Sequence, residues 1–218
     1  MIEGKIFEDL KNAILELNEE KAVKAANDLI KQGIDPLLGI EKGLSPGMAI
    51  IGDKFNRMEC YLPELILAAK TFDAATQILE PEIMKRGKQQ AKRGVVVLGT
   101  VKGDIHKIGK DIVAMLMKTR GFEVHNLGED VSMSTFVDKA AEHNADIIGM
   151  SALLTTTMPA QKEVIDLLKE KKVRNRYIVM VGGAPVHVEW AKQIGADAYA
   201  KTAEEAVSLA MELISGKK

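Results

Sequence analysis

The chain has 218 residues, 46% of them hydrophobic and 28% charged, a mixture typical of a folded protein with one large domain or two small ones. Its 30 basic and 31 acidic residues give a net charge of −1, which argues against a nucleic-acid-binding protein. The sequence shows no signal peptide, no run as long as a membrane span and one cysteine, Cys60, so we expect a cytoplasmic protein with neither a disulfide nor a membrane partner.

Residues 3–84 carry apolar side chains at helical spacing. The first stripe recurs every three or four residues and consists of Ile6, Leu10, Ile14 and Leu17. A second helix is predicted over residues 19–31, because the apolar pattern stops before Gly33. These two helices are expected to begin an all-α bundle.

Prolines mark the starts of the next predicted helices. Asp35-Pro36 and Ser45-Pro46 each place an N-cap side chain before a proline at the first helical position, and a long helix follows Pro63. The apolar positions predicted to face inward are Leu37, Ile40, Leu44, Met48, Ile51, Phe55, Leu65, Ile66, Ala69, Phe72 and Leu79. We therefore predict a bundle of four or five helices over residues 1–88.

Residues 81–94 are polar, basic and without periodicity, as is typical of a linker, so a second domain is predicted over residues 94–218. Its predicted strands are 95–100, 123–127, 146–150, 177–181 and 197–200, and its predicted helices are 107–119, 134–143, 159–172, 187–194 and 203–214. Alternating strands and helices give parallel pairs with right-handed crossovers. The expected fold is a flavodoxin-like (Rossmann-like) α/β domain with a five-stranded parallel sheet of order 2-1-3-4-5.

This strand order predicts where a ligand binds. The chain reverses direction across the sheet beside the first strand, and ligands bind at the carboxyl ends of strands next to such a reversal. The loops after the first, third and fourth strands, residues 99–109, 151–159 and 182–186, should form one rim. These loops are rich in Gly, Ser, Thr or Pro, whereas the loop after the second strand, GEDVSMS, is ordinary.

The first rim loop carries His106, whose imidazole suits a cobalt-like borderline metal. Asp104 lies two residues earlier and could accept a hydrogen bond from the other ring nitrogen of this histidine. Gly103 and Gly109 would let the backbone approach a bulky ligand. Taken alone, the motif Asp-x-His-x-x-Gly is explained better by a solvated loop histidine beside a helix-capping aspartate than by a metal ligand.

The other two rim loops also have ordinary explanations. The hydroxyl groups of residues 151–157 fit helix capping before Pro159, and Gly182-Gly183 fits a tight turn, although paired glycines also admit a large ligand against the backbone. A flavin site is disfavoured because the hydroxyl-rich loop follows the third strand. A zinc site would need more ligands than one histidine and a distant cysteine.

Together these segments resemble a known family. Asp104-x-His106-x-x-Gly109, Ser151-x-Leu153 and Gly182-Gly183 are similar to the signature of cobalamin-binding domains that hold vitamin B12 in the base-off/His-on form. Residues 52–64, GDKFNRMECYLPE, resemble the cap segment of methionine synthase. The resemblance covers about residues 5–215, and its segments follow in the family's order through both halves of the chain.

The resemblance implies roles for the matching residues. His106 would be the lower axial ligand of the corrinoid cobalt, Asp104 would hydrogen-bond to His106, and Thr157 would complete this relay where the family has a serine. Phe55 and Leu62 would cover the upper face of the corrin, although both also fit the bundle core. Ser151, Leu153, Gly182 and Gly183 would line the channel for the displaced base, and the other implied cofactor contacts are Gly103, Lys107, Ile108, Gly109 and Thr155.

A chain with only a cap and a cobalamin domain looks like the corrinoid proteins of methyltransferase systems in methanogenesis or acetogenesis, which serve methylamines, methanol, betaines or aryl methyl ethers. In these systems the cobalt accepts a methyl group from a substrate-specific methyltransferase and passes it to a second methyltransferase, which acts on a thiol or tetrahydrofolate. A reductive activase is a further implied partner. A cobalamin-sensing regulator and a B12-binding mutase subunit are the alternatives, but the first needs a DNA-reading helix and the second needs no cap.

Overall fold

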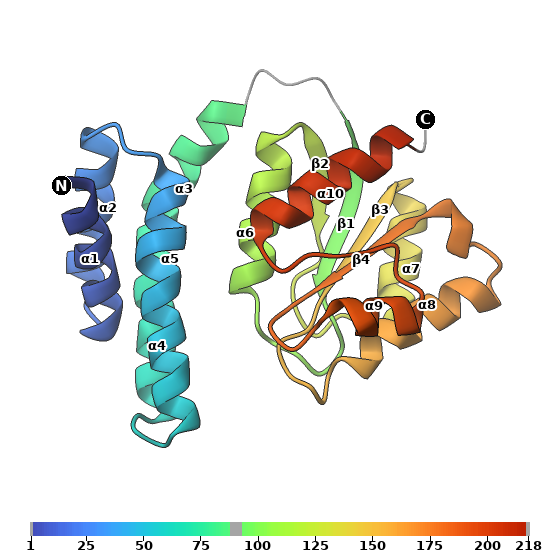
Figure 1. Ribbon diagram of the computed structural model, residues 1–218, viewed down its shortest axis with the longest axis horizontal. Coiled ribbons are helices and arrows are strands. Elements are labelled where there is room, and N and C mark those ends of the chain that lie inside the picture. The colour runs from blue at the N-terminus through green and yellow to red at the C-terminus, as the bar shows by residue number, and fades with distance from the viewer. Residues whose placement is uncertain (1, 88–92, 217–218) are drawn as a thin grey trace. The chain divides into compact units, whose positions relative to one another are not determined.

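Helices make up most of the first part of the chain, as the apolar stripes predict. The computed structural model describes residues 2–87 and 93–216, and the chain divides into two units, Met1–Arg86 and Gly87–Lys218. The helices of the first unit are α1 (Ile2–Leu15), α2 (Glu19–Lys31), α3 (Pro36–Gly39), a π-helical segment (Ile40–Leu44), α4 (Ser45–Asn56) and α5 (Leu62–Gly87) (Figure 1).

The predicted helix starts are confirmed at Asp35 and wrong at Ser45. The Asp35 side chain accepts a hydrogen bond from the backbone N–H of Leu37, 3.1 Å away, with Pro36 at the first helical position. Ser45 instead has helical angles of −64° and −42°, and the chain passes from the π-helical segment directly into α4. Pro46 lacks the N–H that an α-helix needs there, and the wider π turn before it accommodates that loss. At the other end of the first stripe, α1 stops at Leu15, so Leu17 lies in a turn with φ of 55°.

Two glycines explain why the helix continues past Ser45. A Cβ at Gly43 would lie 2.8 Å from the Leu10 Cβ, and one at Gly47 would lie 2.8 Å from the Ile14 Cβ. The π-helical segment and α4 therefore pack closely against α1, and this packing buries Ile40 and Leu44 completely. Tertiary packing outweighs the local stop signal at Ser45-Pro46.

The predicted linker at residues 81–94 begins too early. Residues 81–87 are the last turns of α5, which contains Pro81, and residues 88–92 lie outside the described residues. The helix continues because Leu79 and Ile83 are buried on the same stripe as Phe72, whereas Pro81 faces solvent. Ile66, predicted to face inward on this helix, is 48% exposed.

The second unit has the predicted doubly wound architecture. Its strands are β1 (Gly94–Thr100), β2 (Phe122–Asn126), β3 (Ile147–Ser151), β4 (Ile178–Gly182) and β5 (Ala198–Tyr199). Its α-helices are α6 (Ile108–Thr119), α7 (Met133–Glu142), α8 (Pro159–Glu170), α9 (Val188–Ile194) and α10 (Ala203–Gly216), and a 3-10 turn spans Arg174–Arg176. All strand pairs are parallel and the order is β2-β1-β3-β4-β5, which confirms the flavodoxin-like prediction.

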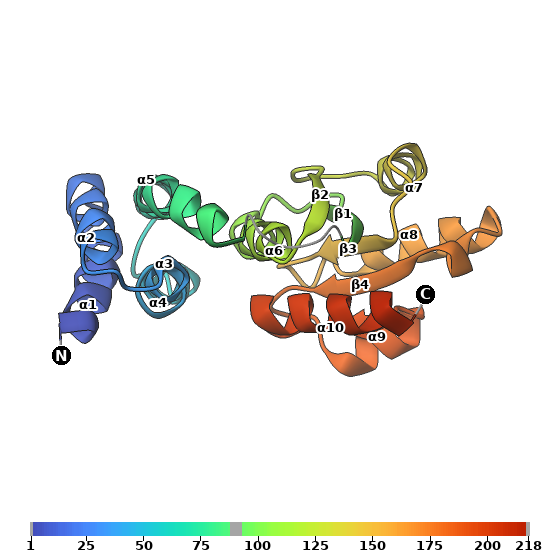
Figure 2. The same ribbon diagram turned by 90° about the horizontal axis from the view of Figure 1, so that it is seen from above.

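Helices cover both faces of this sheet. Helix α6 packs against α10 and β1, whereas α7 packs against α8, and α8 against α9. Figure 2 shows α8 and α10 on opposite sides of β4. Consecutive residues such as Val96 and Val97 are both fully buried. Successive side chains of a strand point to opposite faces of the sheet, so both faces are covered. Within the described residues, no helix is both long and apolar enough to cross a membrane.

Candidate functional site

The ends of three neighbouring strands bring the predicted rim loops together. In the register of the sheet, Thr100 at the end of β1 pairs with Ser151 at the end of β3, and Ser151 pairs with Gly182 at the end of β4. The loops that follow these strands therefore leave the sheet side by side at its carboxyl edge. This is the edge at which doubly wound folds bind their ligands.

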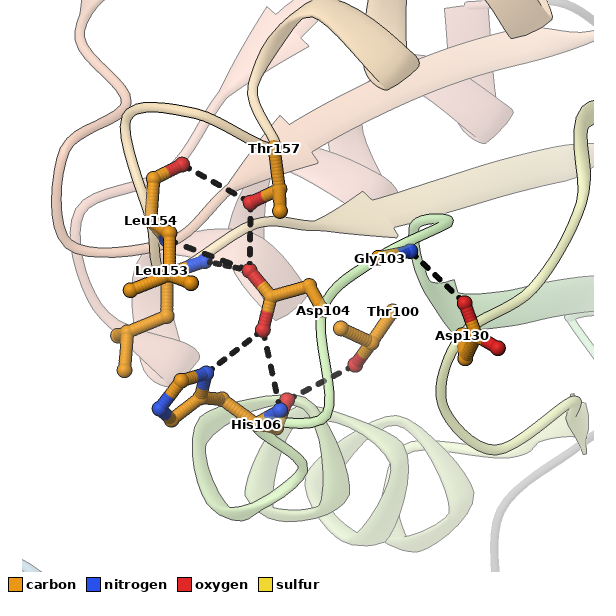
Figure 3. A network of polar contacts seen from close by, with 8 residues as sticks. All are labelled: Thr100, Gly103, Asp104, His106, Asp130, Leu153, Leu154 and Thr157. Carbon is orange, nitrogen blue, oxygen red and sulfur yellow. Dashed lines mark hydrogen bonds and ion pairs between the residues drawn. The ribbon is translucent and has the colours of Figure 1, made fainter.

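Asp104 is the centre of a hydrogen-bond network at this edge (Figure 3). Its side chain is fully buried, and its carboxylate accepts five hydrogen bonds. Oδ2 accepts from the Thr157 hydroxyl at 2.7 Å and from the backbone N–H groups of Leu153 and Leu154 at 2.7 and 3.2 Å. Oδ1 accepts from His106, whose backbone N lies at 3.0 Å and whose Nδ1 lies at 2.7 Å. One carboxylate thus joins the loop after β1 to the loop after β3.

The surroundings of Asp104 keep it ionised. Burial raises the pKa of this carboxyl group, but the hydrogen bonds from Thr157, Leu153 and His106 outweigh burial and lower the pKa to about 2. An ionised carboxylate can only accept hydrogen bonds, so the Nδ1 atom of His106 carries a proton and donates it to Asp104. In the neutral imidazole the lone pair is then on Nε2.

His106 directs this second nitrogen away from Asp104 (Figure 3). Its side chain is 43% exposed, while its backbone carbonyl accepts a hydrogen bond from the Thr100 hydroxyl at 2.9 Å. The described part of the chain contains no group of three or more His, Cys, Asp or Glu residues that could hold a metal ion. A site with one open imidazole nitrogen fits a metal that brings its other ligands with it, as in a macrocyclic cofactor, and does not fit a bare zinc ion.

The second rim loop contributes through some of its predicted residues. Thr157 and the Leu153 amide donate hydrogen bonds to Asp104. Ser151 instead pairs with Thr100 and Gly182 in the sheet, and neither it nor Thr155 takes part in the hydrogen-bond network of Asp104 described above. Thr157 does not cap the following helix, since α8 begins after Met158 without a side-chain cap and the Thr157 hydroxyl points to Asp104 and to the Leu154 carbonyl. The helix-capping explanation of this threonine is therefore wrong.

The glycines of the rim loops differ in why a glycine stands at each position. Gly103 and Gly183 have φ of +82° and +117°, which favour glycine, and a Cβ at Gly183 would lie 1.8 Å from the Ala152 carbonyl oxygen. A Cβ at Gly182 would meet the Ala200 carbonyl oxygen at 3.3 Å. A Cβ at Gly109 would meet no protein atom within 4 Å, so packing within the protein does not require a glycine there and leaves room for a ligand. Lys107 and Ile108 directly precede Gly109, at the start of α6.

Two residues of the first unit were assigned to the cofactor. Phe55 is 38% exposed and Leu62 is 57% exposed, so neither lies in the bundle core, in contrast to the alternative explanation of these positions. Met58 and Tyr61, between them in sequence, are also exposed, so large apolar side chains are exposed at and beside the turn from α4 to α5. Cys60 is buried, with its Sγ atom 3.6 Å from the Ile51 carbonyl oxygen, as expected of a structural thiol.

Several residues of the network were missed by the sequence analysis. Thr100 holds the His106 carbonyl, the Leu154 amide donates to Asp104, and Asp130 accepts a hydrogen bond from the Gly103 amide at 2.8 Å. Leu154 acts through its backbone, which no residue type signals. Thr100 was predicted only as the end of a strand, and Asp130 lies in the loop that we considered ordinary.

Comparisons with known proteins place this geometry in context. Residues 94–210 and residues 6–80 each match a family described as a B12 binding domain. The dimethylamine corrinoid protein 2 of Methanosarcina acetivorans is 48% identical over 212 residues, which cover 97% of each chain. The trimethylamine corrinoid protein 2 of the same organism is 45% identical over 203 residues, 93% of this chain and 94% of the relative.

Solved structures give the same result. The monomethylamine corrinoid protein of Methanosarcina barkeri matches with a TM-score of 0.90 and 37% identity, over 96% of this chain and 98% of that one. The methanol:cobalamin methyltransferase complex of the same organism contains a chain that matches with a TM-score of 0.55 and 27% identity, over 97% and 80% of the two chains.

Proposed function

Because this chain belongs to the corrinoid-protein family of methyltransferase systems, we propose that it carries methyl groups on a bound corrinoid between partner enzymes. The observation that supports this role best is the His106 imidazole, whose Nδ1 atom lies 2.7 Å from the Asp104 carboxylate and whose Nε2 atom is free to bind a metal. The cobalt of the corrinoid, when bound, supplies the methyl-accepting chemistry, and the protein supplies ligand, enclosure and presentation.

The proposed cofactor state is base-off/His-on, in which Nε2 of His106 replaces the cofactor's own base. Asp104 and Thr157 fix the orientation of the ring and make it a better donor, because a carboxylate partner raises the basicity of a metal-bound imidazole. The displaced base is proposed to lie along Ser151, Leu153, Gly182 and Gly183, and Gly103, Lys107, Ile108, Gly109 and Thr155 complete the proposed contacts. The open space at Gly109 supports this assignment.

We propose that Phe55 and Leu62 cover the other face of the corrin. Both are large, apolar and exposed on the first unit, which suits side chains that shield a cofactor at one stage and leave it at another. Residues 1–88 and 94–218 are the proposed bounds of the cap and cobalamin domains. The cytoplasmic location expected from composition remains a prediction.

The partners follow from the relatives. Their names refer to mono-, di- and trimethylamine, so a methylamine-specific methyltransferase is the proposed methyl-giving partner. A second methyltransferase that uses a thiol or tetrahydrofolate, and a reductive activase, complete the proposed system. The chain is proposed to be the non-catalytic corrinoid subunit of this system, which leaves activation of the methyl donor to the partner methyltransferase.

Methyl transfer with purified components tests this proposal. The chain is loaded with hydroxocobalamin, reduced chemically and mixed with radiolabelled mono-, di- or trimethylamine, with and without the corresponding methyltransferase. We expect label on the chain only when a methyltransferase is present, and much less with His106→Ala. Efficient labelling by the isolated chain would make it an enzyme in its own right. Failure of every methylamine methyltransferase to label the loaded chain would refute the carrier role for this class of donor.

A further inference from the structure

The loop that holds His106 is also held from its other side. The loop between β2 and α7 runs along it as a short extension of the sheet. The Thr100 amide donates to the Gly128 carbonyl and the Val131 amide donates to the Thr100 carbonyl, both at 2.9 Å, and Val101 forms a parallel bridge with Val131. The β1–α6 loop therefore lies between the β3–α8 loop, which carries Thr157, and the β2–α7 loop, which carries Asp130.

Asp130 makes two hydrogen bonds with the backbone of this loop. Its Oδ1 atom accepts a hydrogen bond from the Gly103 amide at 2.8 Å (Figure 3). Its own backbone N–H donates to the Asp104 carbonyl oxygen at 2.9 Å. These two contacts flank the Cα atom of Asp104 in the chain. They restrain the 102–103 and 104–105 peptide groups, which enclose Gly103 and Asp104, the residue that holds the histidine.

The backbone at these contacts is unusual. Asp130 has φ of 54°, and Gly103 has φ of 82°, both in the left-handed region. Aspartate is one of the few residues other than glycine that adopt this region, since its short side chain can bond locally. A Cβ at Gly103 would meet only the Thr157 Cγ2 atom, at 3.7 Å, so the glycine is required by its φ and not by crowding.

We propose that Asp130 is a positioning residue for the cobalt-binding histidine, and that it acts by fixing the backbone of Asp104. This inference rests on the proposed function, because it assigns Asp130 a role in the same site. Asp104 must accept from Thr157, Leu153 and His106 at once, and five hydrogen bonds to one carboxylate require its Cα atom to lie in one place. Asp130 restrains this backbone from outside the rim loops, through its side chain at the Gly103 amide and through its own N–H at the Asp104 carbonyl.

The side chain of Asp130 restrains the loop mainly through its hydrogen bond with the Gly103 amide, and its ion pair with Lys102 contributes little. Lys102 Nζ lies 2.9 Å from Oδ2 of Asp130, but the two side chains are 62% and 47% exposed. Ion pairs at such exposure contribute little, because water and salt screen them. A neutral side chain of the same shape at position 130, with an oxygen that accepts from the Gly103 amide, is therefore expected to restrain the loop as well as aspartate does.

Three variants separate these contributions. Asp130→Gly tolerates the positive φ and removes the acceptor, Asp130→Asn keeps an acceptor oxygen and tolerates the same φ, and Lys102→Met removes only the ion pair. Each full-length variant is titrated with hydroxocobalamin, and the visible spectrum reports the fraction with histidine bound. We expect Asp130→Gly to weaken binding about 10-fold, within the range for residues that orient a metal ligand, and to lower the His-bound fraction. Asp130→Asn and Lys102→Met should stay within about twofold of wild type, an expectation based on the small contribution of exposed ion pairs.

The outcomes are distinguishable from those of the proposed function. If Asp130→Gly binds like wild type while His106→Ala loses the His-bound spectrum, the role of Asp130 is refuted and the carrier site stands. If His106→Ala keeps the wild-type spectrum, the proposed axial ligand itself is wrong. Amide hydrogen exchange of Gly103 in the cofactor-free wild-type chain decides the matter if Asp130→Gly does not fold. Protection similar to that of the Leu153 amide supports the contact, and free exchange overturns it.

Discussion

Replacement of Asp104 by asparagine tests how the histidine is held. The two side chains have the same shape, but the amide has one donor end and one acceptor end, whereas all five groups around the Asp104 carboxylate donate. Turned towards Thr157, Leu153 and Leu154, the NH2 group would face three donors. Turned towards His106, it faces a ring that can change tautomer and accept at Nδ1. The proton then lies on Nε2, the atom that is proposed to bind cobalt.

The cost to stability follows from the pKa of Asp104. This pKa falls from an ordinary value of 3.8 to about 2 in the folded protein. Each tenfold change in acidity corresponds to about 1.4 kcal/mol, so the ionised carboxylate contributes about 2 kcal/mol, or somewhat less. Because the folded pKa is lowered, this contribution is fully present above the unfolded pKa near 4 and is lost as the pH falls through about 2. Asp104→Asn should therefore lower the unfolding free energy by about this amount at pH 7, and the deficit should shrink below pH ~4.

Urea unfolding of the cofactor-free chain measures this difference. Trp190 is the only tryptophan and lies on α9, so its fluorescence reports on the α/β unit alone. Asp138→Asn is the matched control, because Asp138 is 67% exposed and has one ion contact of 3.6 Å with Lys171. Its unfolding curve should match wild type. Equal stability of wild type and Asp104→Asn at neutral pH, or a deficit that does not change between neutral and acidic pH, would refute the reasoning.

The remaining predictions concern the ligand, the rim and the cap. His106→Ala should abolish the His-bound spectrum of added cobalamin but leave the cofactor-free fold intact, since this side chain is 43% exposed; an unfolded variant would contradict the second half. Gly183→Ala should destabilise the α/β unit by at least about 1–3 kcal/mol, because of its positive φ and its clash with a carbonyl, whereas Gly182→Ala should have a much smaller effect in the same urea assay. Phe55→Ala/Leu62→Ala should shorten the lifetime of the reduced, loaded protein in air without changing its thermal unfolding, since both side chains are exposed; an unchanged lifetime would remove their proposed role.

Much of the fold is predictable from the period of the apolar residues. The change from helical stripes to short apolar runs after Gly94 predicts the strands of the second unit to within a residue or two, and the alternation of strands and helices predicts the observed order. Errors fall at Ser45-Pro46, where a proline was taken as a helix start, and at residues 81–87, which were taken as part of a polar linker. Burial of Leu44 on one side of the first proline and of Ile83 beyond the second keeps these segments helical, and such burial depends on distant residues.

The candidate site was predictable in part. The chemistry of Asp104 and His106 is visible in their types and spacing, and the doubly wound topology explains why the loop after β3 meets them. Thr157 was found only through a family resemblance. The roles of the Leu154 amide and of Asp130 depend on backbone conformation, including the positive φ of Asp130. The sequence does not reveal this conformation for an aspartate in a loop.

The network has a consequence for cofactor binding. Asp104 is buried, ionised and fully hydrogen-bonded by residues of the protein itself, so the orientation of His106 does not depend on the ligand. The conformational entropy of the ring is lost when the chain folds and not when the corrinoid binds. A carrier that must retain its cofactor through contacts with more than one enzyme benefits from such preorganisation, because each partner can then meet the metal at the same position. The ring thus combines a fixed orientation with partial exposure, the two properties that the proposed cobalt ligand of a methyl carrier requires.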